Sequence, residues 1–217
     1  MKKVALIVAG GRGNRMNTTI PKQFLLLKSL PILMHTLNQF SHFDQIILVL
    51  ATTEFDTWKQ LCKEHNFTLK HTLVAGGVNR FSSVKNGLSK VPEESIVAIH
   101  DGVRPLVSKK LISTLINATK KEIGIVPVTP VKDSLRKADG HKSKSVSRNS
   151  LYKVQTPQCF FASTIIDAYK QNFSLFFTDD ASVLESNGGK IKTIKGEEKN
   201  IKITTQQDLK IAEAFIE

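Results

Sequence analysis

The feature that most constrains the fold is a regular alternation of apolar, strand-length runs with amphipathic segments over the first 128 residues. Strands are predicted for residues 4–9, 45–51, 68–75, 96–100 and 123–128, and helices for residues 31–40, 53–64, 80–90 and 108–120. Thr53 and Ser108 are the predicted N-caps of their helices. This alternation predicts an α/β fold with a mostly parallel, twisted sheet and helices on both faces. Ligands of such sheets bind at the carboxyl ends of the strands.

The alternation stops at residues 131–155, which are polar and rich in Lys and Ser. This stretch is either a disordered loop or a projecting β-arm. Four apolar residues that could anchor pairing strands favour the arm: Val131, Leu135, Val146 and Val154. Helices are predicted afterwards for residues 162–171, 179–186 and 205–216, and strands for residues 190–194 and 200–203. No linker or repeat divides the chain, so one domain over residues 1–217 is predicted, with 131–155 as its arm.

The first predicted strand leads into a glycine-rich loop with two cations beyond it: Ala9, Gly10, Gly11, Gly13, Arg15 and Lys22. Glycine lets main-chain N–H groups approach a ligand closely, and bare donors with two cations suit a polyphosphate. The dinucleotide fingerprint is incomplete because Met16 stands at its third glycine, and the Gly-Lys-Ser/Thr of a P-loop is absent. A tight turn without a ligand is the alternative interpretation.

Further polar clusters stand where later strands should end. Residues 75–83 combine two glycines with serines at a helix start, which suits an anion or a base edge as well as an ordinary cap. Asp101 could hold a sugar hydroxyl or a metal-bound water, and Arg104 could bind phosphate. An internal ion pair between these two side chains is the alternative.

Three later positions complete the predicted site. Arg148 and Thr156 could reach a second phosphate, although a solvated arginine and a turn would give the same pattern. Lys202 lies within an apolar alternation, where a lysine is costly without an anion nearby. Since no catalytic triad or metal-ligand spacing is present, the predicted chemistry is the alignment of anions by cations, as in phosphoryl or nucleotidyl transfer.

The net charge of +12, from 31 Lys and Arg against 19 Asp and Glu, leaves two classes of partner open. Nucleic acid is disfavoured because the lysines are scattered and no aromatic-basic platform accompanies them. The same field would steer a highly anionic small substrate. No apolar run approaches membrane-spanning length, and the chain enters a strand at once, so a cytoplasmic protein is expected. Cys62 and Cys159 are expected to be reduced thiols.

Seven motifs, taken in order, resemble the 2-C-methyl-D-erythritol 4-phosphate cytidylyltransferases of the non-mevalonate isoprenoid pathway. They are AGGRGNRM…PKQF, GGVNRFSSVKNGL, HDGVRP, PVKDS, SRN…QTPQCF, TDDAS and NIKITT, which cover nearly the whole chain. The resemblance implies a Rossmann-like, nucleotide-diphosphosugar-transferase fold. It also implies an enzyme that joins CTP and the sugar-alcohol phosphate, releasing 4-diphosphocytidyl-2-C-methyl-D-erythritol and pyrophosphate. A divalent cation such as Mg²⁺ and a homodimer with interlocking arms are part of the same expectation.

The resemblance further implies roles for individual residues. The cations that grip the CTP phosphates and catalyse the transfer would be Arg15, Lys22 and Lys202. The remaining CTP site would comprise Ala9, Gly10, Gly11, Gly13, Gly77, Ser83 and Gly102. The acceptor would be bound by Asp101, Arg104, Ser134, Arg148, Thr156 and Thr178, partly across the dimer, and Asp101 is the one residue that could also help to place the metal.

This chain departs from the family pattern at a few positions. Ser134 stands where threonine is usual, Val78 stands where a polar residue is common, and Gly102 with Val103 replaces a pair of alanines. None of these changes removes a cation. A pentitol-phosphate cytidylyltransferase, such as the ribitol 5-phosphate enzyme, is the alternative within the superfamily. The PVKDS and TDDAS segments look more like the methylerythritol enzymes.

Overall fold

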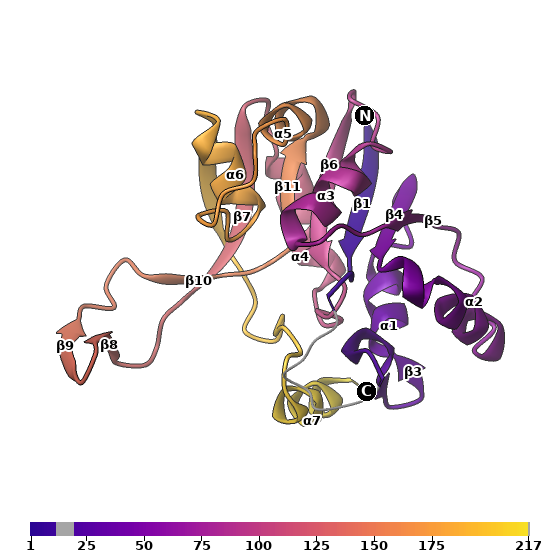
Figure 1. Ribbon diagram of the computed structural model, residues 1–217, viewed down its shortest axis with the longest axis horizontal. Coiled ribbons are helices and arrows are strands. Elements are labelled where there is room, and N and C mark those ends of the chain that lie inside the picture. The colour runs from indigo at the N-terminus through magenta and orange to yellow at the C-terminus, as the bar shows by residue number, and fades with distance from the viewer. Residues whose placement is uncertain (12–19, 217) are drawn as a thin grey trace.

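The computed structural model describes residues 1–11 and 20–216. Its body is an eight-stranded sheet with the order β10 (Tyr152–Val154), β7 (Ile123–Pro130), β11 (Gln158–Phe161), β6 (Ser95–Asp101), β1 (Lys2–Val8), β4 (Gln45–Leu50) and β5 (Thr72–Ala75), and β12 (Lys190–Lys195) pairs with β7 (Figure 1). A small hairpin of β2 (Leu26–Leu27) and β3 (Leu30–Pro31) lies outside it. The predicted α/β class is confirmed.

The parallel part of the sheet brings the ends of several strands together. β6, β1, β4 and β5 run parallel, and Val8 stands opposite both Asp101 and Val49. The loops after β1, β5 and β6 therefore leave the same edge of the sheet. Val4 to Ile7 are fully buried, as expected for a strand covered on both faces.

Helices cover both faces, as the alternation predicted (Figure 1). One apolar cluster packs Ala5 and Ile7 of β1 against α1 (Ile32–Gln39), α2 (Phe55–Glu64) and α4 (Lys109–Ala118). The other packs Val4 and Leu6 against α3 (Arg80–Leu88), α5 (Ala162–Ala168) and α6 (Asp180–Ser186). Successive side chains of a strand point to opposite faces, which explains this division. The last helix, α7 (Gln206–Phe215), packs on a smaller cluster around Ile203.

Two local predictions are wrong, and the strands β2, β3 and β11 were not predicted. Thr53 does not cap α2, because it lies in a 3₁₀ turn, η3 (Thr52–Glu54), and α2 has no side-chain cap. Residues 200–203 form no strand. The backbone carbonyl of Asn200 accepts from the Arg104 side chain, and the Asn200 side-chain amide donates to the carbonyl of Thr156, so Asn200 bonds to other loops rather than to a neighbouring strand. β11, which sequence periodicity missed, enters antiparallel between β6 and β7. The predicted cap Ser108 is confirmed, since its hydroxyl accepts from the N–H of Leu111 at 3.0 Å.

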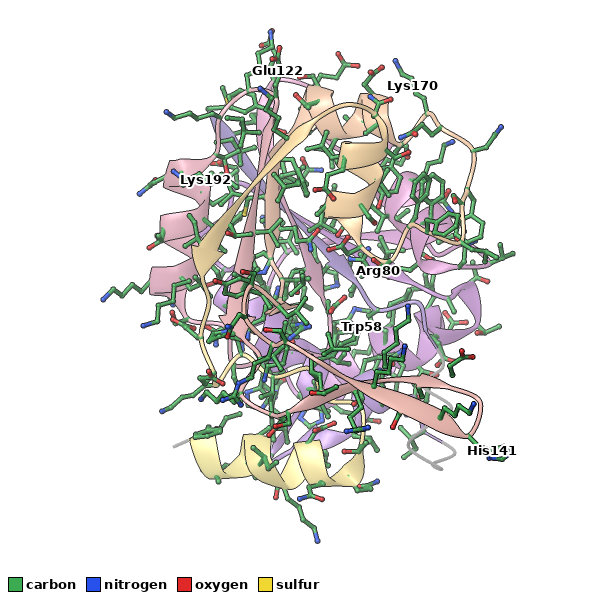
Figure 2. The ribbon with its side chains drawn as sticks, turned by 90° about the vertical axis from the view of Figure 1, so that its left-hand side faces the viewer. Trp58, Arg80, Glu122, His141, Lys170 and Lys192 are labelled. Atoms are coloured by element: carbon green, nitrogen blue, oxygen red, sulfur yellow. The ribbon has the colours of Figure 1, made fainter. Side chains whose placement is uncertain are left out.

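The predicted β-arm is present. β8 (Leu135–Asp139) and β9 (Lys142–Val146) pair antiparallel and project from the body (Figure 1). Leu135 stands opposite Val146, and His141 marks the tip in Figure 2. At the base of the arm, Val154 pairs with Val128 of the main sheet. Nearly every side chain of the hairpin is exposed, so the arm adds little to the core of its own protomer.

None of the helices in the described part of the chain combines the length and the apolar character needed to cross a membrane.

Candidate active site

A cavity of about 220 Å³ lies where β1, β5 and β6 end. It is lined by Val8, Ala9, Gly10, Gly11, Lys22, Gln23, Gly77, Val78, Asn79, Arg80, Ser83, Asp101, Val103 and Lys202. Eight of the residues predicted for the site are therefore brought together: Ala9, Gly10, Gly11, Lys22, Gly77, Ser83, Asp101 and Lys202. The predictions for Gly13 and Arg15 fall on residues outside the described part of the chain.

One wall of the cavity comes from the end of β1 and from η2 (Lys22–Phe24), a 3₁₀ turn. The Gln23 side chain is almost fully buried and donates to the carbonyl of Ala9 at 3.0 Å. This hydrogen bond ties the turn that carries Lys22 to the strand that carries the glycines. Gln23 was not predicted as a residue of the site. The signal in the sequence is its position between Lys22 and the buried Phe24, where a polar side chain needs a hydrogen-bond partner.

A second wall of the cavity is the start of α3 with the loop before it. Asn79 caps the helix in a reciprocal capping box with Ser82. The Ser83 hydroxyl accepts from the N–H of Gly77 at 3.0 Å and donates to the carbonyl of Asn79 at 2.8 Å. A Cβ on Gly77 would lie 2.4 Å from the Ser82 hydroxyl oxygen, so only glycine fits there. Ser83 thus shapes the loop that faces Gly10.

Asp101, at the end of β6, is surrounded by cations. Its Oδ2 lies 3.1 Å from Arg104 Nε and 3.1 Å from Lys202 Nζ, and its Oδ1 lies 3.8 Å from Arg80 Nε. Burial alone would raise the pKa of Asp101, but Arg80, Lys202 and Arg104 outweigh it and hold the pKa well below its usual range. The carboxylate is therefore ionised. Three cationic side chains and this one carboxylate line the described walls of the cavity, which favours an anionic ligand.

Arg104 and Thr156 lie behind Asp101, buried and outside the cavity lining. The Thr156 hydroxyl accepts from the N–H of Asp101 at 3.1 Å and bonds to Nδ1 of His100 at 2.9 Å. His100 Nε2 lies 3.0 Å from the carbonyl oxygen of Arg104. A carbonyl can only accept, so Nε2 carries the proton and Nδ1 accepts from Thr156. These residues fix the position of Asp101.

The buried imidazole predicts a pH-dependent stability. Burial lowers the pKa of His100 from 6.5 to about 4. Between those values the unfolded chain binds a proton that the folded chain does not, so stability falls as the pH falls through this window. Between about pH 7.5 and about pH 4.5, the free energy of unfolding of the wild type should fall by about 2–3 kcal/mol more than that of His100→Gln. Denaturant unfolding of both proteins across this range measures the difference, and parallel pH curves would contradict it.

Gly102 is packed against the sheet rather than exposed in the cavity. A Cβ on Gly102 would lie 2.8 Å from the Cβ of Ala9, and its carbonyl accepts from Thr36 Oγ1 at 3.0 Å. Gly102 was predicted in the CTP site, but it lies behind the lining residues. The close approach of β1 and β6 at their ends is what requires a glycine there.

Three further residues predicted for the acceptor, besides Arg104 and Thr156, lie outside the cavity lining of their own chain. Ser134 and Arg148 are exposed and belong to the arm, where Arg148 donates to the carbonyl of Lys132. Thr178 is exposed and precedes α6. Asp180, two residues after Thr178, forms an ion pair with Arg80. This ion pair connects the start of α6 to the cavity, because Arg80 lines the cavity wall.

The described side chains do not form a cage for a resident divalent cation. No group of three or more His, Cys, Asp and Glu side chains is placed to hold one in residues 1–11 and 20–216. Asp101 is the one carboxylate in the described lining, and two cations already occupy its Oδ2. This donor set fits a cation that arrives on the phosphates of a ligand.

Comparisons with known proteins identify the family of this chain. The sequence model of the 2-C-methyl-D-erythritol 4-phosphate cytidylyltransferase family matches residues 3–217. The enzyme of that name from Azobacteroides pseudotrichonymphae is 50% identical over 222 residues, covering 100% of this chain and 99% of the relative. The one from Bacteroides fragilis is 47% identical and covers 100% of both chains.

A solved structure has the same fold. The crystal structure of 2-C-methyl-D-erythritol 4-phosphate cytidylyltransferase from Thermus thermophilus superposes with a TM-score of 0.82 at 29% identity. The superposition covers 99% of this chain and 98% of that one. The likeness therefore includes the arm as well as the sheet.

Proposed function

Because this chain belongs to the 2-C-methyl-D-erythritol 4-phosphate cytidylyltransferase family, we propose that the cavity at the ends of β1, β5 and β6 is its active site. The enzyme transfers the cytidylyl group of CTP to 2-C-methyl-D-erythritol 4-phosphate and releases pyrophosphate. The single observation that carries the placement is the cluster of cations around a glycine-lined cavity. An anionic nucleotide and an anionic acceptor both need such charge.

In the proposed reaction, an oxygen of the acceptor phosphate attacks the α-phosphorus of CTP. A new P–O bond forms, the bond from the α-phosphorus to the bridging oxygen breaks, and pyrophosphate leaves with that electron pair. No general base is needed, since a phosphate monoester with a second pKa of about 6 is largely a dianion at neutral pH. The barrier falls because fixed cations stabilise the negative charge that gathers at phosphorus.

The residues take the following proposed roles. The backbone of Ala9, Gly10, Gly11 and Gly13 cradles the CTP phosphates, and Gly77 and Ser83 shape the pocket for the nucleoside. Lys22, Lys202 and Arg15 supply the positive charge. Asp101 holds the hydroxyls of the acceptor. Arg104 and Thr156 support Asp101 from behind, because in this chain their polar groups bond to it, to His100 and to Asn200.

A divalent cation such as Mg²⁺ is the proposed cofactor. Oxygens of the CTP phosphates would hold it, and Asp101, the carboxylate among the described lining residues, would contribute a further oxygen. When bound, the ion supplies further neutralisation of phosphate charge.

The arm points to a homodimer. Ser134 and Arg148 are exposed on a hairpin that projects away from its own body (Figure 1), so they are proposed to complete the acceptor site of a partner protomer. Cys62 and Cys159 are both free thiols, which is consistent with a proposed place in the reducing cytoplasm.

The proposed function is tested by pyrophosphate release with purified enzyme and Mg²⁺. We expect turnover with CTP and methylerythritol phosphate, and little with UTP or ATP as the donor or ribitol 5-phosphate as the acceptor. A higher kcat/KM for ribitol 5-phosphate would move the enzyme to the pentitol-phosphate class. Equal rates with all three nucleotides would contradict the assigned CTP site.

A further inference from the structure

A buried ion pair lies directly behind the cavity, between segments far apart in the sequence. Asp180 is fully buried at the start of α6. Its Oδ1 accepts from Arg80 Nη1 at 2.8 Å and its Oδ2 accepts from Arg80 Nη2 at 2.7 Å. This two-point contact fixes the plane of the guanidinium, which a single contact would not do.

Tyr169 completes the arrangement from the end of α5. Its hydroxyl donates to Asp180 Oδ1 at 2.6 Å, and its side chain is almost fully buried. Burial, with the nearby charge of Asp180, raises the pKa of Tyr169 well above its usual value, so the hydroxyl keeps its proton. The Tyr169 ring stacks on Phe81, the residue after Arg80, with centroids 4.7 Å apart. α5 and α6 therefore hold the first turn of α3 at two neighbouring residues.

Arg80 itself faces the cavity. Its side chain is 30% exposed, and its Nε lies 3.8 Å from Asp101 Oδ1. Figure 2 labels Arg80 near the middle of the view, whereas Lys170 lies at the margin of the molecule. A cation at the start of a helix opposes the helix dipole, so the position needs the Asp180 contact to be stable. The first turn of α3 also carries Ser83 and follows Gly77, two residues of the proposed nucleoside pocket.

We propose that Arg80 binds CTP and that Asp180 and Tyr169 are positioning residues that hold its guanidinium at the cavity wall. This inference rests on the proposed function, because it takes the cavity to be the CTP site. A guanidinium fixed in advance can meet an anionic or carbonyl group of the nucleotide without losing further side-chain freedom on binding. A released guanidinium would have to be ordered by the ligand itself.

The test is steady-state kinetics at a temperature where every variant is folded. Asp180→Asn keeps the size of the side chain but removes its charge, and should raise KM for CTP roughly tenfold. Arg80→Lys keeps the charge but loses the two-point contact, and should do at least the same. KM for methylerythritol phosphate should stay within about twofold in both. Asp167→Asn is the matched control, since Asp167 is exposed on α5 and pairs only with surface groups.

A double mutant separates positioning from packing. If Asp180 acts through Arg80, adding Asp180→Asn to Arg80→Lys should raise KM for CTP by less than about twofold more. Independent, multiplying effects would overturn the proposal. So would variants that melt at lower temperature yet keep the wild-type KM for CTP, or a rise confined to KM for the acceptor.

Tyr169→Phe keeps the inference testable if Asp180→Asn fails to fold. It removes one hydroxyl and keeps the ring on Phe81, and should raise KM for CTP by about threefold. An unchanged KM for CTP in this variant would overturn the role of Tyr169. Wild-type enzyme that released no pyrophosphate from CTP would instead contradict the proposed function.

Discussion

Replacing Lys22 with alanine should lower kcat by at least about 10² while the protein still folds. Removing one fixed donor from a site where charge develops typically costs about 10²–10³ in kcat. Lys22 lines the cavity on η2, next to the glycines that end β1. The turn itself is held by the buried Gln23, which the substitution leaves in place. Pyrophosphate release at saturating CTP and acceptor measures the effect.

The control for this experiment is Lys59→Ala. Lys59 lies exposed on α2, and its ion pair with Asp56 is a surface one. It should keep wild-type kcat, which shows that loss of positive charge alone has no effect on the rate. Melting temperature checks that Lys22→Ala is folded. A kcat within about threefold of wild type would remove Lys22 from the chemical step.

The second large effect is recovery of activity when two inactive proteins are mixed. If each site combines Lys22 of one protomer with Arg148 of the other, Lys22→Ala and Arg148→Ala homodimers both have two damaged sites. A heterodimer of the two has one intact site and one doubly damaged site. After equal mixing and subunit exchange, about half of the dimers are hetero, so activity should rise to about a quarter of wild type.

The mixing experiment has its own control. Arg136→Ala also removes an arginine from the arm, where Arg136 bonds only within the hairpin at Ser143. It should be active by itself. Tagged heterodimers, purified by two affinity steps, establish that exchange occurred. If they show no activity above the parent proteins, each site is built within a single chain.

The main sheet could be predicted because its signal is local. Buried parallel strands are near-continuous apolar runs, and the helices between them have a clear period, so neither depends on distant residues. β11 lacks that signal, since its four residues are too few to show a period. Residues 200–203 show the opposite error. Their alternation around Ile201 and Ile203 comes from packing beneath α7, not from a ladder.

The candidate site divides in the same way. Residues on glycine loops that end strands were found, because loop composition and strand order place them at one edge of the sheet. Arg80 was not predicted as a site residue because its orientation depends on its contact with Asp180, one hundred positions away in sequence. Arg104 and Thr156 were predicted at the ligand itself, but the structure places them behind Asp101. Sequence spacing gives no indication of which side of a carboxylate a neighbour will occupy.

The place of β11 also limits how this chain can be divided. β6 and β7 follow each other in sequence, yet the position between them is filled by a strand that begins at Gln158, after the arm. A fragment ending anywhere before that residue would leave the inner edges of both strands unpaired. Open strand edges of that kind recruit other chains and promote aggregation. The arm, which looks like the natural point of division, is therefore the wrong place to split this protein for fragment complementation or for expression in two pieces.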